Sequence, residues 1–290
     1  MNRVRGGKLR RRSGRDQSRP YMRQLLQKSM SLQLEETPDA PASTSVLGVR
    51  VDRVTREQAL DRIEHMIVFR RANATMQHCQ QVVTVNTEFV MAAQHDSDFR
   101  QAINGAALVV ADGIGIVWAT YLGKTPVPER ITGTDTVEAL AKRCAAAGYR
   151  MYLLGAAPGV AEQAAARLQA IAPGLIIAGT YAGSPALEEE DAILERVGVA
   201  DADVLCVAYG APAQDLWIAR NMARLPVAVA MGVGGAFDFL SGRQRRAPRI
   251  LQRVGLEWLY RLYREPWRWK RMLAIPRFML YVLVKGRKSG

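Results

Sequence analysis

The chain has 290 residues, of which 49% are hydrophobic, so it can bury the core of one large domain with extensions. Its net charge of +13 is unevenly placed. Residues 1–30 carry ten Lys or Arg against one acid, residues 243–290 carry fourteen against two, and the segment between them is net acidic. No apolar run reaches the ~18 residues of a spanning helix, and no apolar stretch follows the basic N-terminus, which argues against a membrane-spanning protein and a signal peptide.

Cysteine usage points to a reducing compartment. The three cysteines, Cys79, Cys144 and Cys206, lie in apolar or helical contexts without CxxC or histidine spacing. They are therefore interpreted as reduced core thiols of a cytoplasmic protein, not as metal ligands or a disulfide set.

The predicted elements divide the chain into three parts. Residues 1–45, rich first in Arg and Gly and then in Pro, Ala, Ser and Thr, are predicted to be a disordered basic arm. Residues 46–242 alternate apolar, strand-like runs with helical stretches, which is typical of an α/β, Rossmann-like parallel sheet with helices on both faces. The expected strands are 46–51, 81–85, 108–111, 150–154, 175–178, 203–208 and 227–231. The expected helices include 56–70, 87–104, 134–147, 160–172 and 214–223.

The last part, 243–290, is predicted to be a basic helical appendage with helices over 248–263 and 266–284. Tryptophan and tyrosine alternate there with arginine. On the residues alone, this pattern suits an anionic membrane surface and a nucleic acid about equally.

Polar and glycine residues follow several predicted strands. In parallel sheets ligands bind beyond these carboxyl ends, and glycine turns let backbone N–H groups approach a phosphate. Glycine turns occur at 112–115, 155–159 and 232–235, so Gly113, Gly155, Gly234 and Gly235 are candidate substrate-binding residues. None of these turns completes GxGxxG with a ribose-binding carboxylate, which makes a nicotinamide-dependent oxidoreductase the weaker alternative.

Asp112 directly follows the predicted strand 108–111. A carboxylate there can act as a general base, or it can cap the next helix, and the pattern leaves both open. Asp201 and Asp203 form a DxD, a metal–nucleotide motif of many glycosyltransferases, but this pair precedes its strand and is interpreted as a loop-to-strand start. No chemistry is assigned to the three histidines, His65, His78 and His95.

Seven ordered strings carry a family resemblance: TVNTEF, ADGIGIV, PERITGTD, LLGAAPG, YGAPAQDLW, GVGGAFDFLSGRQRRAP and GLEWLYRLYREPWRWKR. From about Val46 to Tyr281 the chain resembles the WecG/TagA/CpsF glycosyltransferases, glycosyltransferase family 26. The resemblance implies transfer of N-acetylmannosamine, its uronic acid or glucose from a UDP-sugar to a polyprenyl-diphosphate-linked sugar, in cell-surface polysaccharide biosynthesis. It also implies an inverting reaction with no metal and no cofactor.

The resemblance also implies roles for individual positions. Asp112 matches the proposed general base, Thr84 and Asn86 match pocket residues near the sugar and acceptor, and Arg130 and Gln214 match an active-site arginine and a pocket amide.

In the second half of the chain, Asp238 matches a position at the nucleotide site. Arg261, Arg268 and Arg271 match appendage arginines that close over the site and neutralise the diphosphate, and they share one helical face if the helix continues through Pro266.

One string departs from the family. Where members often have Gly-Ser-Pro-Lys-Gln-Glu, this chain keeps Gln214 but has Ala213 and Asp215 in place of the lysine and glutamate.

With the resemblance, the appendage is expected to bind an anionic membrane and not nucleic acid, which places the enzyme peripherally on the inner face of the cell membrane. The N-terminal arm is either an additional tether or a solvated tail. A non-enzymatic nucleic-acid-binding protein remains the other alternative. The donor sugar and acceptor sugar stay open, as does a homo-oligomer.

Overall fold

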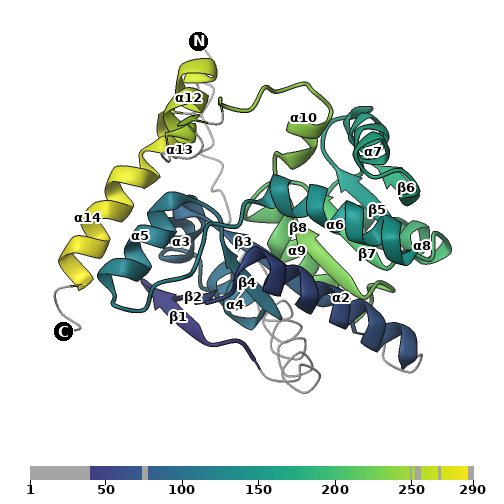
Figure 1. Ribbon diagram of the computed structural model, residues 1–290, viewed down its shortest axis with the longest axis horizontal. Helices are drawn as coiled ribbons and strands as arrows, with labels where there is room; N and C mark the ends of the chain where they lie inside the picture. Colours follow the sequence, from purple (N-terminus) through teal and green to yellow (C-terminus); the bar gives the residue numbers. More distant parts are fainter. Residues whose placement is uncertain (1–39, 74–77, 249, 252–255, 267–268, 287–290) are drawn as a thin grey trace, which may run out of the picture.

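The computed structural model describes residues 40–73, 78–248, 250–251, 256–266 and 269–286, drawn in colour in Figure 1. At 261, 270, 271, 285 and 286 only the backbone is described.

A six-stranded sheet forms the centre of the molecule. Its strand order is β4-β3-β8-β7-β5-β6, and every neighbouring pair is parallel. Most of its residues are apolar and buried on both faces, which explains why the strands could be predicted from continuous apolar runs in the sequence. The strands are β3 (Gln80–Val85), β4 (Leu108–Ala111), β5 (Arg150–Gly155), β6 (Ile176–Tyr181), β7 (Val204–Ala208) and β8 (Val229–Gly232).

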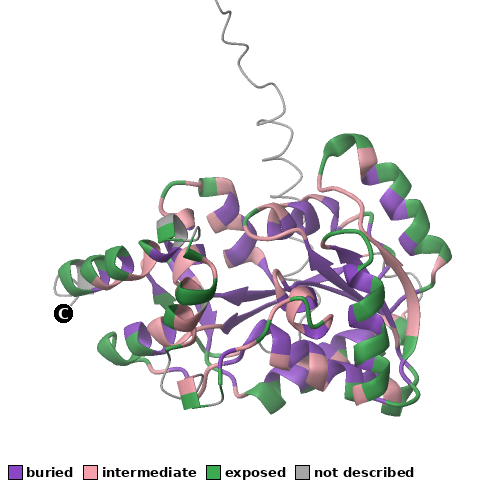
Figure 2. Ribbon diagram, turned by 90° about the horizontal axis from the view of Figure 1, so that it is seen from above, coloured by how far each residue is buried: buried purple, intermediate pink, exposed green. Residues whose placement is uncertain are grey.

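Helices cover both faces of this sheet, so the predicted fold class is confirmed (Figures 1 and 2). One face packs against α2 (Arg56–Ala72), α6 (Gly133–Ala147), α7 (Val160–Ile171) and α10 (Ala236–Leu240). The other face packs against α3 (Thr87–Ala93), α4 (Ser97–Gly105), α5 (Ile114–Leu122), α8 (Glu190–Val199) and α9 (Ala213–Asn221). A short 3-10 turn, η1 (Leu187–Glu189), precedes α8.

The first predicted strand, 46–51, is wrong. The structure has an antiparallel hairpin there, β1 (Ser43–Val46) and β2 (Val49–Asp52), separate from the central sheet. The chain turns at Leu47 and Gly48, which both have positive φ, +51° and +83°, as a two-residue hairpin turn requires. Strand β1 begins at 43, inside the segment 1–45 predicted to lack structure, whereas residues 1–39 lie outside the described part.

The predicted helix 87–104 is two helices. Helix α3 ends at Ala93, and α4 starts anew at Ser97, because Asp96 caps it by accepting a hydrogen bond from the Phe99 N–H at 2.9 Å.

The C-terminal part contains α12 (Glu257–Arg264), α13 (Trp269–Met272) and α14 (Ala274–Gly286), where two longer helices were expected. Because α12 ends at Arg264, the continuous helix that would align Arg261, Arg268 and Arg271 is not formed. Arg268 and the side chains of the other two lie outside the described residues. Helix α14 docks on α3 and α5, with Phe278 fully buried. Among the helices that the structure describes, none is long and apolar enough to cross a membrane.

Candidate active site

The carboxyl edge of the sheet has a point where the chain's winding direction reverses. From β3 the chain moves outward to β4, whereas β8, on the other side of β3, is reached through β7. Such reversals leave a crevice between the flanking turns, where α/β proteins bind ligands. The turns after β3, β4 and β8 therefore position the candidate site.

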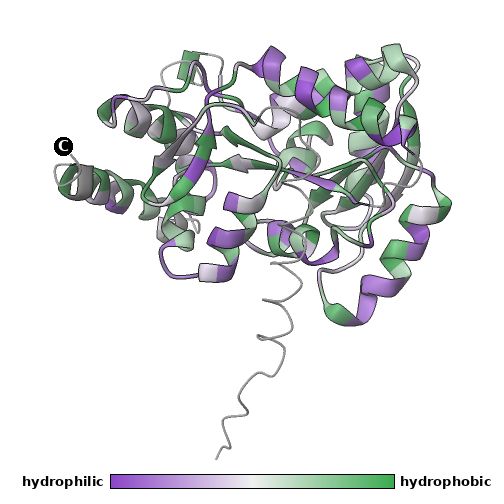
Figure 3. Ribbon diagram, turned by 90° about the horizontal axis from the view of Figure 1, so that it is seen from below, coloured by the Kyte–Doolittle hydropathy of each residue, from purple (hydrophilic) through white to green (hydrophobic). Residues whose placement is uncertain are grey.

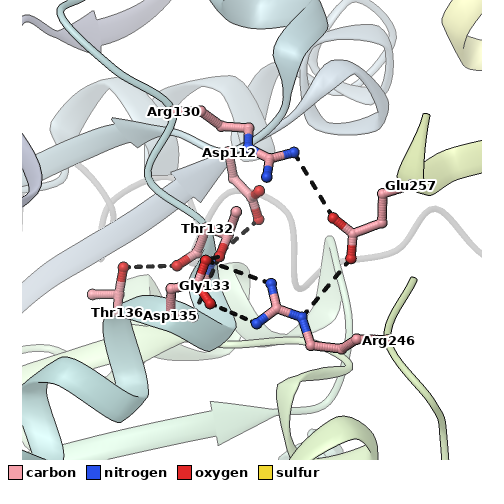
Figure 4. Close-up of polar contacts among 8 residues, drawn as sticks. All are labelled: Asp112, Arg130, Thr132, Gly133, Asp135, Thr136, Arg246 and Glu257. Atoms are coloured by element: carbon pink, nitrogen blue, oxygen red, sulfur yellow. Dashed lines mark hydrogen bonds and ion pairs between the residues drawn. The ribbon is translucent and has the colours of Figure 1, made fainter. Parts of the chain in front are cut away.

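Asp112 is the first residue after β4 and lies at this crevice, half-buried. The N-cap of α5 is Gly113, with φ +120°, so Asp112 is not the cap of the helix that follows it. Instead its Oδ2 accepts a long hydrogen bond, 3.4 Å, from the Gly133 N–H at the start of α6 (Figure 4). The helix N-terminus favours a negative charge at this point.

Thr84 belongs to the same group. A Cβ built on Gly133 would lie 3.6 Å from Thr84 Oγ1 and 4.0 Å from Asp112 Oδ2, so these polar atoms converge on one buried glycine. Thr84 is itself 6% exposed. The structure thus brings together Thr84 and Asp112, two of the predicted catalytic residues.

Asn86 lies beside this group, but its side-chain oxygen is used to cap a helix. Its Oδ1 caps α3 by accepting a hydrogen bond from the Phe89 N–H at 3.1 Å. Its Cβ is 3.7 Å from the Cβ position of Gly113, which places the two turns in contact.

Gln214 links two turns of the same edge. The residue is 2% exposed. Its Oε1 accepts hydrogen bonds from the N–H groups of Gly210, at 3.1 Å, and Gly234, at 2.9 Å. A Cβ on Gly232 would come within 2.6 Å of Gln214 Nε2, so the amide fits only against glycine. The residue predicted to be a pocket amide therefore fixes the turns after β7 and β8.

Packing explains one of the predicted glycines. Gly155 has φ +102°, and a Cβ there would lie 2.8 Å from the carbonyl carbon of Ala208. The last residues of β5 and β7 touch through their backbones at this point.

Gly235 is the N-cap of α10, and Asp238 in that helix accepts a hydrogen bond from the Gln244 N–H, 2.9 Å, through its backbone oxygen.

A chain of four charged side chains crosses from the α6 turn to the C-terminal part (Figure 4). Arg246 donates to Asp135 at 2.5 Å, and its Nε lies 4.0 Å from Glu257 Oε1. The second oxygen of Glu257 lies 3.8 Å from Arg130 Nη1. Burial raises the pKa of the Asp135 carboxyl, but hydrogen bonds from Arg246 and Thr132 outweigh burial and hold that pKa below its usual value.

Comparison with known proteins identifies the family of this chain. The model of the Glycosyl transferase WecG/TagA/CpsF family matches residues 44–290. The chain belongs to this family.

Curated relatives of this family member include an N-acetylglucosaminyldiphosphoundecaprenol N-acetyl-beta-D-mannosaminyltransferase of Bacillus subtilis (strain 168), 35% identical over 72% of this chain and 80% of the relative. A protein of the same name from Staphylococcus aureus (strain MW2) is 31% identical over 86% of this chain and 94% of the relative. The resemblance stated from the seven strings is confirmed, and the chain is a glycosyltransferase.

In this WecG/TagA/CpsF family member, the DxD lies at the amino edge of the sheet, as predicted. Asp203 accepts hydrogen bonds from Arg71 Nε and from the Arg150 N–H, both at 2.7 Å. It therefore fixes the start of β7, far from Asp112 along the strand direction. Among the described residues, no three His, Cys, Asp or Glu side chains are grouped as metal ligands would be.

The cysteines are buried and unpaired, as expected from the sequence. Burial raises the pKa of the Cys79 and Cys206 thiols to about 12, which keeps them protonated and unreactive.

Sequence reasoning missed three of the four charged residues that link α6 to α12, namely Asp135, Arg246 and Glu257. All three lie within or beside the quoted strings, in RITGTD, RQRRAP and GLEWLY. The available signal was their charge, since Asp135 lies at the start of the predicted helix 134–147 and Glu257 lies within the predicted helix 248–263, but nothing local indicated that the three residues meet one another.

Proposed function

We propose that this chain transfers N-acetylmannosamine from a UDP-sugar to polyprenyl-diphosphate-linked N-acetylglucosamine, with inversion and without a metal. The names of the relatives support the sugar and the acceptor, since alignment covers 80–94% of those proteins. The observation that carries the proposal is the position of Asp112, at the crevice, facing the N-terminus of α6 and beside Thr84.

In the proposed reaction, a hydroxyl oxygen of the acceptor attacks the anomeric carbon of the donor. The bond between that carbon and the diphosphate oxygen breaks, and UDP leaves with the electron pair. Asp112 takes the hydroxyl proton, which is the task of a general base in a single displacement. Thr84, with Oγ1 close to the same glycine, is positioned to orient the sugar.

The diphosphate needs positive charge as it leaves. We assign this task to Arg130 and to Arg261, Arg268 and Arg271 of the appendage. Guanidinium groups bind phosphate oxygens in a fork geometry, so they can supply the charge that a metal supplies elsewhere. The use of Asp203 at the opposite edge supports a route that does not depend on the DxD.

We further propose that α5 and α14 contact the membrane that holds the acceptor. On α5, Trp118, Tyr121 and Leu122 are each more than half exposed. The neighbouring α14 exposes Leu280, Leu283 and Val284, and Figure 3 colours much of this helix, beside the C label, as hydrophobic. Exposed aromatic and aliphatic side chains next to a basic segment suit the interface of an anionic bilayer.

The test is UDP release from a panel of UDP-sugars, with a short-chain lipid-diphosphate-N-acetylglucosamine acceptor, with and without EDTA. We expect release that requires the acceptor, is highest with UDP-N-acetylmannosamine and is unchanged by EDTA. Preference for UDP-glucose or for the uronic acid would overturn the assigned sugar. Loss of release in EDTA would overturn the metal-independent mechanism.

The membrane assignment has its own test, sedimentation with vesicles. We expect binding to vesicles that contain anionic lipid, weakened when Leu280 and Leu283 are both replaced by Asp. The matched control replaces Leu187, an exposed leucine on η1, by Asp. Equal binding by the two variants would refute a contact through α14.

A further inference from the structure

The charged chain Asp135–Arg246–Glu257–Arg130 joins parts that are far apart in the sequence. Asp135 lies in the first turn of α6, Arg246 in the segment after α10, and Glu257 is the first residue of α12. Their side chains are only 21–35% exposed. In Figure 4 the guanidinium of Arg246 lies between the two carboxylates.

Asp135 is connected to the proposed base, Asp112, through the two neighbouring residues Thr132 and Gly133. Thr132 caps α6: its Oγ1 donates to Asp135 Oδ2 at 2.7 Å and accepts from the Asp135 N–H at 3.3 Å. The next residue, Gly133, donates its N–H to Asp112. A shift of Asp135 therefore moves the turn that holds Asp112.

Folding stability accounts for only part of this arrangement. The hydrogen bond from Arg246 lowers the pKa of Asp135 and so stabilises the fold at neutral pH, whereas looser pairs of partly exposed charges such as Glu257–Arg130 contribute less. Two of the contacts, at 3.8 and 4.0 Å, are ion pairs beyond hydrogen-bond distance. What the arrangement does fix is geometry, because one guanidinium faces carboxylates on two separate elements.

We infer that Arg246 is a positioning residue with two roles. It holds the start of α12 against the carboxyl edge of the sheet, and it keeps residues 130–135 in the position that catalysis requires. The kinetic part of this inference rests on the proposed function. The structural part, the placement of α12, does not. Arg246 acts through Asp135 and Glu257, and through them on Arg130 and Asp112.

The first experiment compares Arg246→Gln with the wild type in the UDP-release assay. Small misplacements of catalytic groups cost about 100-fold in rate, so we expect kcat to fall by about ten- to 100-fold while the donor KM changes much less. Arg246→Lys keeps the charge but has no planar fork, and it should recover only part of the loss. Glu257→Gln should lower kcat similarly.

The double variant tests the coupling. If Arg246 acts through Glu257, the effects of Arg246→Gln and Glu257→Gln will not add, whereas independent sites multiply their effects. The matched control is Arg143→Gln, which removes an arginine that contacts Glu57, Asp61 and Glu64 away from the crevice. A full multiplicative effect, or an Arg246→Gln profile like that of Arg143→Gln, would overturn the inference.

The second experiment does not depend on activity. Spin labels at Gln163→Cys on α7 and Tyr263→Cys on α12 occupy exposed positions, and the native cysteines are buried. We expect one narrow distance distribution, broadened or shifted by Arg246→Gln and unchanged by Arg143→Gln. The inference would be overturned if Arg246→Gln left the distance distribution unchanged, or if the distribution were already broad in the labelled protein that retains Arg246. Either result would count even if no donor is turned over. A protein without transferase activity but with this response would overturn the proposed function alone.

Discussion

Replacing Gln214 by Met tests whether the turns after β7 and β8 must be held together for catalysis. Methionine keeps most of the side-chain volume, but its thioether sulfur is only a weak acceptor and does not replace the amide oxygen that binds the N–H groups of Gly210 and Gly234. Both glycines are half-buried, so each N–H left without its acceptor costs the lower end of the usual range, about 1 kcal/mol. If the whole of that cost, about 2 kcal/mol, falls on the catalytic arrangement, kcat/KM drops about 30-fold.

The assay is acceptor-dependent UDP release across donor concentrations, paired with urea unfolding of the same preparations. Gln163→Met, at an exposed position of α7, is the matched control and should behave as the wild type. The reasoning is refuted if Gln214→Met keeps kcat/KM within about threefold of the control. It is also refuted if the loss is confined to unfolding stability, because Gln214 would then support the fold without setting the site.

Three further changes probe the base, the backbone and a buried acid. Asp112→Asn should retain donor binding by calorimetry and lose about 100- to 10,000-fold in turnover, and turnover within tenfold of the wild type would remove Asp112 as the base. Gly155→Ala should unfold at a lower temperature than Gly159→Ala, because its Cβ would meet the Ala208 backbone while Gly159 has nothing within 4 Å; equal melting temperatures would contradict this. Burial raises the pKa of the Asp215 carboxyl from 3.8 to about 7, so the folded state binds more protons than the unfolded state between these values and stability falls as pH rises through them. Asp215→Asn should therefore unfold at higher urea than the wild type at pH 8 but not at pH 4, and an equal difference at both pH values would exclude this titration.

The sheet was predictable because burial on both faces leaves a continuous apolar run in the sequence. Strand β4 was predicted with its observed bounds, and β5 with one residue missing. The hairpin at 43–52 was not, because its turn uses Leu47 at positive φ. A branched side chain in that conformation is uncommon, so the sequence offered a single apolar run.

The residues of the candidate site also differ in whether the local sequence pattern predicts them. Thr84 and Asp112 could be found because position at a strand end follows from the local pattern, and parallel topology then brings strand ends together. Arg246 and Asp135 pair across 111 positions. Their contact depends on where the segment after α10 runs, which no periodicity encodes.

The position of Asp112 has a consequence for the rest of the proposed mechanism. The N–H of Gly133 at the start of α6 already serves the carboxylate, so it is not free to neutralise the diphosphate of the donor. The proposed mechanism assigns the positive charge for the leaving group to side chains, those of Arg130 and of the arginine-rich segment beyond α10. That segment also carries α14, whose exposed apolar residues we assign to the membrane. On this reasoning the charge that stabilises the leaving group and the surface that meets the lipid-linked acceptor belong to one unit, and Arg246 fixes that unit to the sheet. Turnover should therefore depend on the appendage being seated, even for an acceptor short enough to leave the membrane.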